Sequence, residues 1–179
     1  AARELTRSVL VPGTARIAWL DAVPELAMTR DRRKGFLAAA SEAGVSTLVE
    51  SGPHYDRDSG AAMMTRILQE HGLPDALVTA SYTLLQGVLD VLLDLPDGPP
   101  QQLRLATFGD DRLLDFLPVS VNSLPQDHEA IARATLDQAM AALEPGTPCK
   151  TVTINRSLKT RPRAPDLQAR QTTTGAAAD

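Results

Sequence analysis

The sequence ALVTASYTLLQGVLDVLL, residues 76–93, predicts a short buried strand followed directly by an amphipathic helix. Its first five residues are apolar or small and follow the turn-forming pair Pro74-Asp75, as expected of a buried strand. Ser81 suits the N-cap of the next helix. Apolar residues then recur at helical spacing and form one stripe of Leu84, Leu85, Val88, Leu89 and Leu92. A strand that leads straight into a helix is typical of α/β proteins.

The same unit repeats on both sides of this stretch. Short apolar runs bounded by turn residues predict strands, and runs with helical spacing predict helices. The expected strands are residues 16–23, 46–50, 76–80 and one within 103–111, and the expected helices are residues 2–10, 29–43, 59–71 and the helix after Ser81. This alternation predicts an α/β fold with a parallel sheet and helices on both faces. Ligands of such sheets bind at the carboxyl ends of the strands.

The alternation ends after Asp111. The pieces expected beyond it are the apolar segment LLDFLP (113–118), an extended piece SVNS (120–123), a helix over 126–143 and a last strand TVTI (151–154). From Arg161 onward the sequence has no periodic apolar pattern, so a disordered tail is expected.

Composition narrows the class of protein. The 179 residues are 43% hydrophobic but only 3% aromatic, so one domain with an aliphatic core is expected. A net charge of −4 gives no general attraction to nucleic acid. One cysteine and three scattered histidines lack metal-binding spacing, and no nucleotide-binding motif is present, so no metal or other cofactor is expected. No segment matches a signal peptide or membrane span, which predicts a cytoplasmic protein without a membrane partner.

Three stretches carry a resemblance to a known family: PELAMTRDRRKGFLAAA (24–40), TASYTLLQGVLDVL (79–92) and RLATFGDDRLLDFLPVSVNSLPQDHEAIA (104–132). They resemble the LacI/GalR family of transcription regulators, most of all its fructose repressor branch, over about residues 1–161. The string TFGDDRLLDFLP (107–118) is the most specific part. The resemblance implies a type I periplasmic-binding-protein-like core, in which an effector lies in the cleft between two lobes.

The resemblance also implies a domain organisation. Residues 1–118 and 147–160 would form the second lobe, residues 119–146 a crossover and one helix of the first lobe, and residues 161–179 the tail. The DNA-binding head and most of the first lobe would lie outside this sequence, so we expect no operator binding by this chain. The apolar stripe of its first-lobe helix would then lack its usual partner.

Two charged residues are the first candidates for effector binding. Arg32 lies three residues before Gly35 in an RxxGF pattern, and a guanidinium suits a phosphate or vicinal hydroxyls because its donors form a fixed fork. The alternative is a solvated helix charge. Asp110 follows the fourth strand, where a carboxylate can accept hydrogen bonds from two sugar hydroxyls or simply form a turn. In the family that this sequence resembles, both positions face the effector cleft.

Three further residues are weaker candidates. Ser81 and Tyr82 open a helix, where amides and hydroxyls suit an anion, although Ser81 can act as a plain N-cap. Many family members have Asn-Asp at these two positions, so the contacts here would differ. Gln126 matches a position that lines the cleft in the family, and its alternative role is that of an ordinary helix N-terminal residue.

An apolar cluster predicts self-association. LLDFLP lies near the helix after Ser81 in the expected fold, and a contiguous apolar patch commonly marks an interface. The expected homodimer residues are Leu85, Leu89, Leu113, Leu114, Phe116 and Leu117.

The function implied by the resemblance is sensing of a sugar phosphate, fructose 1-phosphate or a relative of it, without catalysis. Two alternatives remain open at this point. A periplasmic-type sugar-binding protein would share the fold but not the dimer surface, and a small flavodoxin-like α/β enzyme or receiver domain would show activity or phosphorylation.

Overall fold

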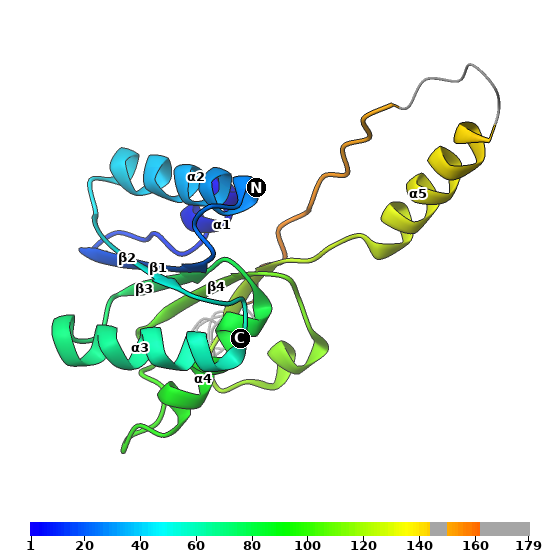
Figure 1. Cartoon of the computed structure of the whole chain (residues 1–179). Helices are drawn as coiled ribbons and strands as arrows, with labels where there is room; N and C mark the ends of the chain where they lie inside the picture. Colours follow the sequence, from blue (N-terminus) through cyan, green and yellow to red (C-terminus); the bar gives the residue numbers. More distant parts are fainter. Residues whose placement is uncertain (144–149, 162–179) are drawn as a thin grey trace, which may run out of the picture.

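The computed structural model describes residues 1–143 and 150–161, which form a five-stranded parallel sheet flanked by helices (Figure 1). The strand order is β2-β1-β3-β4-β5. The strands are β1 (Arg16–Ala22), β2 (Ser46–Gly52), β3 (Ala76–Thr79), β4 (Arg104–Phe108) and β5 (Val121–Leu124). The predicted α/β fold with a parallel sheet is therefore confirmed, and the extended piece SVNS belongs to the sheet as its fifth strand.

Helices cover both faces of the sheet, as predicted. One face carries α1 (Ala2–Arg7) and α2 (Ala27–Ala43), and the other carries α3 (Arg57–His71) and α4 (Tyr82–Leu93) (Figure 1). Side chains alternate between the two faces along a strand. In β1, Ile17 and Trp19 pack with the α1–α2 core, whereas Ala18 and Leu20 pack with the α3–α4 core.

Side-chain caps set the helix boundaries, which differ from the predicted ones by a few residues. Asp56 Oδ1 accepts a hydrogen bond from the Ser59 amide at 2.8 Å, so α3 begins before the expected Ser59. Ser81 Oγ accepts from the Leu84 amide at 3.2 Å, which confirms the predicted N-cap of α4. Asp127 caps α5 (His128–Ala142), so this helix starts after Gln126 rather than at it.

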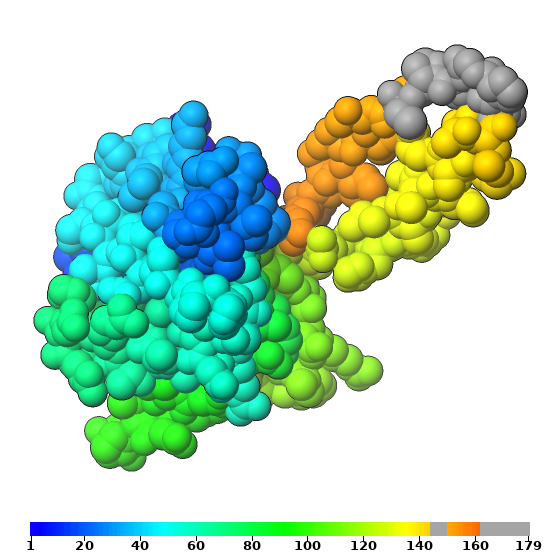
Figure 2. Space-filling model, in the orientation of Figure 1, coloured from blue at the N-terminus to red at the C-terminus, as the bar shows by residue number. Residues whose placement is uncertain are grey.

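The helix α5 stands apart from the sheet (Figures 1 and 2). None of its residues is buried, and its apolar side chains Ile131, Leu136 and Met140 are exposed. The apolar stripe predicted for this helix is exposed in the described part of the chain: Ala132, Leu136, Ala139 and Leu143. The assignment of residues 119–146 and 147–160 to separate lobes stays a prediction. The predicted tail lies outside the described residues, apart from Arg161.

The strand expected at residues 151–154 is wrong. This segment is extended but pairs with no strand, and it runs beside α5, where the Lys150 amide donates to Gln138 Oε1 at 3.1 Å. The backbone groups of a helix are already bonded within the helix, so α5 offers no partner for a strand ladder. Further on, Lys159 forms an isolated antiparallel bridge with Ser123 on β5.

Two glycines let α3 and α4 approach each other backbone to backbone. A Cβ atom on Gly60 would lie 2.2 Å from the Leu84 carbonyl oxygen, and one on Gly87 would lie 1.9 Å from the Arg57 carbonyl oxygen. Neither distance is sterically possible, so both positions require glycine while the helices keep this spacing.

Gly87→Ala should therefore destabilise the fold although alanine is the better helix former. We expect the free energy of unfolding to fall by about 1–3 kcal/mol, because the methyl group forces the helices apart. Urea unfolding followed by circular dichroism measures this. Gln86→Ala is the control, since Gln86 is the half-buried neighbour on the same helix. Equal stability of Gly87→Ala and the wild type would contradict the close approach.

Candidate functional site

The predicted effector residues gather at the carboxyl ends of β3, β4 and β5. Ser81 and Tyr82 follow β3, Asp110 follows β4, and Gln126 follows β5. Arg32 reaches the same edge from α2, where its Nη1 donates a hydrogen bond to the Ala80 carbonyl at 2.7 Å. This is the edge at which open parallel sheets bind ligands.

Arg32 lies over an aromatic ring and opposite a second arginine. Its guanidinium carbon is 4.3 Å from the centroid of the Phe108 ring. The guanidinium carbon of Arg156 lies 5.7 Å from the same centroid, and Arg156 Nη1 donates to the Leu124 carbonyl at 3.1 Å. Two cations from distant parts of the sequence thus share one ring at the end of β4.

These two cations have no counter-charge in the described part of the chain. The ion pairs within residues 1–143 and 150–161 all involve other basic residues, so no carboxylate of this part of the chain neutralises Arg32 or Arg156. Burial, and then the charge of Arg156, lowers the pKa of Arg32, and burial lowers the pKa of Arg156. Arginine stays protonated in proteins, so this edge of the sheet is cationic and suits an anion.

Ser81 and Tyr82 contribute hydroxyls to this edge. Ser81 Oγ caps α4 and lies 2.9 Å from Thr83 Oγ1, so its structural role is established whatever else it binds. Burial, and then the charge of Asp111, raises the pKa of the Tyr82 phenol. Its hydroxyl therefore remains protonated at neutral pH and can both donate and accept hydrogen bonds.

Asp110 is engaged within the chain itself. Its Oδ1 accepts from Ser123 Oγ and from Arg161 Nη2, both at 2.7 Å, and its Oδ2 accepts from Lys159 Nζ at 3.2 Å. Burial alone would raise the pKa of Asp110, but these three hydrogen bonds outweigh burial and lower the pKa. A carboxylate has about four acceptor sites, so roughly one remains for a ligand hydroxyl.

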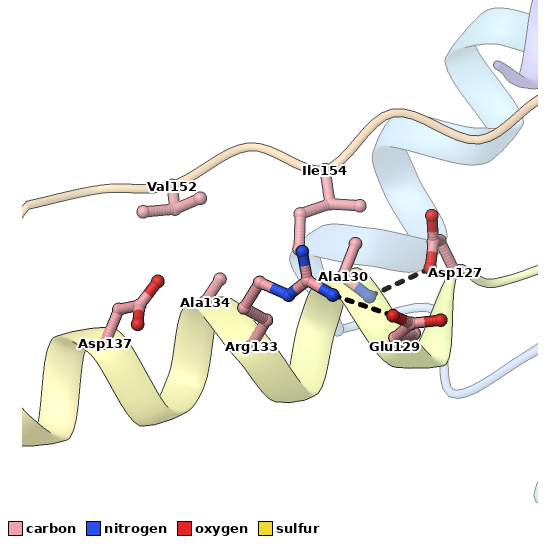
Figure 3. A pocket seen from close by; sticks show the side chains of 8 residues that line it. All are labelled: Asp127, Glu129, Ala130, Arg133, Ala134, Asp137, Val152 and Ile154. Carbon is pink, nitrogen blue, oxygen red and sulfur yellow. Dashed lines mark hydrogen bonds and ion pairs between the residues drawn. The ribbon is translucent and has the colours of Figure 1, made fainter.

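Gln126 lines a different hollow, between α5 and the segment from Lys150 to Arg156. That groove has a volume of about 410 Å³ and includes Arg156 in its wall. A second groove of about 420 Å³ also lies between α5 and this segment, where Val152 and Ile154 line it opposite the helix (Figure 3). Its charged lining consists of three carboxylates and one arginine, which does not suit an anion: Asp127, Glu129, Asp137 and Arg133.

Residues 11–162 match the model of the periplasmic binding protein-like domain family. The chain belongs to this family. This periplasmic binding protein-like domain is 45% identical over 161 residues to the fructose operon regulatory protein of Vibrio cholerae, covering 90% of the chain and 49% of that relative. It is 37% identical over 147 residues to the catabolite repressor/activator of Escherichia coli K12, covering 81% and 44%. The chain thus spans about half the length of the curated relatives it matches.

Solved structures give the same picture. The Cra transcriptional dual regulator from Pseudomonas putida, in complex with fructose 1-phosphate, is 39% identical with a TM-score of 0.84, over 89% of this chain and 60% of that one. A dimeric Lac repressor is 16% identical with a TM-score of 0.75, over 89% and 59%, and shares the fold alone. The predicted resemblance to LacI/GalR regulators is confirmed.

Within residues 1–143 and 150–161, no group of histidine, cysteine, aspartate or glutamate side chains is arranged to hold a metal ion. No helix in this same part of the chain has the length and apolar character needed to cross a membrane.

Sequence patterns did not point to Arg156, Phe108 or Arg161 as site residues. Arg156 follows the expected strand 151–154 and belongs to no motif, and Phe108 was counted as part of an apolar strand and of the string 107–118 without a role of its own. Arg161 was placed at the start of a tail, yet its side chain is only 8% exposed and bonds Asp110, Asp115 and the Val121 carbonyl. Arg161 reaches these partners because Lys159 pairs with Ser123 in an isolated antiparallel bridge, and only the fold shows that pairing.

Arg161→Met should expose how much this ion-pair cluster stabilises the fold. Removing the guanidinium leaves the largely buried Asp110 carboxylate with weaker partners, so we expect the free energy of unfolding to fall by about 2–4 kcal/mol at neutral pH. Urea unfolding measures this. Arg133→Met is the control, because the Arg133–Glu129 pair is exposed and such pairs contribute little.

The same variant predicts a pH dependence with a defined sign. In the folded chain the pKa of Asp110 and that of Asp115 are lowered. The stabilisation is therefore fully present above the unfolded-state pKa, about 3.9, and is lost as the pH falls through the folded-state values. The stability difference between wild type and Arg161→Met should shrink below about pH 4. A constant difference down to pH 3 would show that the carboxylates are not its source.

Proposed function

We propose that this chain is the effector-binding part of a LacI-type transcription regulator and that it binds a sugar phosphate, fructose 1-phosphate or a close relative. The observation that carries the proposal is the pair Arg32 and Arg156, held at the carboxyl edge of the sheet over Phe108 without a carboxylate partner among residues 1–143 and 150–161. The complex of the 39%-identical Cra structure with fructose 1-phosphate supports the choice of ligand.

The phosphate group accounts for most of the expected affinity. A sugar phosphate carries nearly two negative charges at neutral pH, and within the described residues each guanidinium donates a single hydrogen bond, to a backbone carbonyl. The remaining donors are available to phosphate oxygens in charge-assisted hydrogen bonds. The amino end of α4, at Ser81 and Tyr82, adds backbone amides and a favourable helix dipole.

The sugar would be held by weaker neutral contacts. The remaining acceptor site of Asp110, the Tyr82 hydroxyl and the exposed Gln126 amide are the groups available for sugar hydroxyls. The described residues form one wall of this site, so water keeps access to the bound ligand and weakens its charged hydrogen bonds. We therefore expect this chain by itself to bind in the millimolar range.

In an intact regulator, this binding would act by closing a cleft. A ligand held by both lobes favours the closed arrangement and shifts the population away from the form that binds the operator. The lobe described here would supply the cationic wall. DNA binding would belong to a separate domain of such a regulator, and the protein would act as a sensor rather than an enzyme in the cytoplasm.

Dimerisation is the second part of the proposal, and the structure narrows the residues that can serve it. Leu85, Leu89 and Leu114 are buried in the core of the chain itself, so they support the patch rather than form its surface. Leu117 is half-buried. Leu113 and Phe116 are 65% and 72% exposed on the 3-10 helix η1 (Arg112–Phe116) and are the residues available to a second copy.

Binding can be tested by titrating the chain with fructose 1-phosphate in calorimetry or NMR. We expect Arg32→Ala and Arg156→Ala each to weaken binding roughly tenfold or more, because each removes charge-assisted hydrogen bonds. Asp110→Ala should also weaken binding, because it removes the acceptor proposed for a sugar hydroxyl. Arg133→Ala removes an equal charge from the distant α5 and should bind as the wild type does.

Unphosphorylated fructose separates the two halves of the ligand. It lacks the dianion that the arginine pair is proposed to hold, so no binding is expected at the concentrations that saturate with fructose 1-phosphate. Equal binding of fructose and fructose 1-phosphate would contradict the assignment of Arg32 and Arg156 to the phosphate. Micromolar affinity of the wild-type chain would contradict the one-wall account.

Self-association can be tested by light scattering at tens of micromolar, an order of concentration suited to a moderately stable dimer. We expect a dimer for the wild type and a monomer for Phe116→Asp, because a charge buried in an apolar interface lacks a partner. Leu143→Asp is the control, since Leu143 is similarly exposed but lies at the end of α5. A wild-type monomer would contradict the proposal.

A further inference from the structure

Three aromatic side chains, those of Trp19, Phe36 and Phe108, form a cluster next to the arginine pair. The whole sequence has one tryptophan, two tyrosines and three phenylalanines. Trp19 contacts two of the phenylalanines: its ring centroid lies 5.1 Å from that of Phe36 and 6.5 Å from that of Phe108, the second in an edge-on arrangement at 86°. All three rings are buried. The buried core is mostly aliphatic, and this aromatic cluster adjoins the two guanidiniums through Phe108.

A buried carboxylate, that of Asp21, forms a hydrogen bond with the indole of this cluster. Trp19 Nε1 donates to Asp21 Oδ2 at 2.6 Å, and Asp21 is fully buried. Arg33 donates to both oxygens of Asp21, at 2.8 and 2.7 Å, and Ser51 Oγ donates at 2.8 Å. A carboxylate with four such donors is fixed in place, so the indole that bonds to it is fixed as well.

Phe108 connects the fixed Trp19 ring to the two arginines at the edge of the sheet. It is the last residue of β4, it is 5% exposed, and Gly109 turns the backbone away with a φ of 93°. Both guanidiniums contact its ring, with Arg32 at 4.3 Å and Arg156 at 5.7 Å from the centroid. The negative face of an aromatic ring attracts cations, which offsets part of the repulsion between the two arginines. A leucine would fill similar space without that attraction.

We infer that Phe108 is the positioning residue of the anion site: its ring, fixed by Trp19, holds Arg32 and Arg156 at a set spacing before the ligand arrives. The inference rests on the proposed function for the identity of the anion. Two arginines that approach without a support would have to be ordered by the ligand, at a cost in affinity. Phe108 itself touches no ligand in this account and acts through the two guanidiniums.

Phe108→Leu tests the inference against Phe36→Leu. Both changes remove a buried ring from contact with Trp19, but only Phe108 contacts the arginines. We expect Phe108→Leu to weaken the binding of fructose 1-phosphate and of inorganic phosphate by roughly fivefold to thirtyfold. Phe36→Leu should change either affinity by less than about twofold. It should nevertheless lower the free energy of unfolding about as much as Phe108→Leu does. Phe108→Tyr keeps the ring and should restore binding.

A spectroscopic measurement tests the support without any ligand. Protons above an aromatic ring are shifted upfield, so the Arg32 Hε signal should lie upfield in the wild type and in Phe36→Leu and return to the ordinary range in Phe108→Leu. Absence of the upfield shift from the wild type overturns the inference. Equal losses of affinity in Phe108→Leu and Phe36→Leu, or unchanged affinity in a folded Phe108→Leu, overturn it too.

Failure of the proposed function can be distinguished from failure of the inference about Phe108. If the wild type binds neither fructose 1-phosphate nor inorganic phosphate, the proposed function is contradicted. The Arg32 Hε shift then still decides whether Phe108 holds the guanidinium. If Phe108→Leu does not fold, the wild-type shift and the affinity of Phe108→Tyr decide the outcome: a shift with wild-type affinity supports the inference, and their absence contradicts it.

Discussion

Parallel pairing of the strands brings their carboxyl ends to one edge of the sheet, and the candidate site depends on this arrangement. A parallel strand can follow another only through a crossover, so each strand end is followed by a connection on the same side of the molecule. Ala80, Phe108 and Leu124 end or directly follow three neighbouring strands. Their carbonyls and side chains become neighbours in space for that reason, and the arginines from α2 and from the last described segment bond to them.

The arginine pair is an electrostatic cost that the free chain carries. Two half-buried cations that face one ring repel each other. Burial weakens their hydration and lowers the pKa of each, and the charge of Arg156 lowers that of Arg32 further. The fold offsets the cost with the Phe108 ring and with one carbonyl for each guanidinium. An anion would relieve the rest. Binding sites of this kind lower the stability of the unliganded protein, and the same unpaired charge provides affinity when the ligand is present.

The segment after α5 connects this site to the exposed apolar patch. Lys159 bridges β5, and Arg161 binds Asp110 at the site edge and Asp115 on η1. The register of this segment also decides where Arg156 lies, three residues before Lys159. One cluster of charges therefore fixes both the second arginine of the site and the short helix that exposes Leu113 and Phe116.

Local patterns in the sequence determined much of this protein. The strand–helix alternation, the caps at Ser81 and the C-terminal glycine of α2, and the position of Asp110 just after a strand all follow from periodicity and turn chemistry within a few residues. Arg32 was a candidate because of its RxxGF pattern and the family resemblance. A local pattern specifies which face of an element is apolar, and in an alternating chain that is enough to specify a parallel sheet.

Only the tertiary structure decided which residues meet across the chain. Arg156 belongs to no motif, the string that contains Phe108 assigned that residue no role, and the contact between the two depends on how the chain returns along β5 after α5. The same holds for the apolar patch, where Leu114 is buried and its neighbour Leu113 is exposed. The strand expected at residues 151–154 failed for a related reason, because a strand needs a partner with free backbone groups and that segment lies beside a helix. Sequence periodicity reports what a segment can bury, whereas the fold decides what is available to cover it.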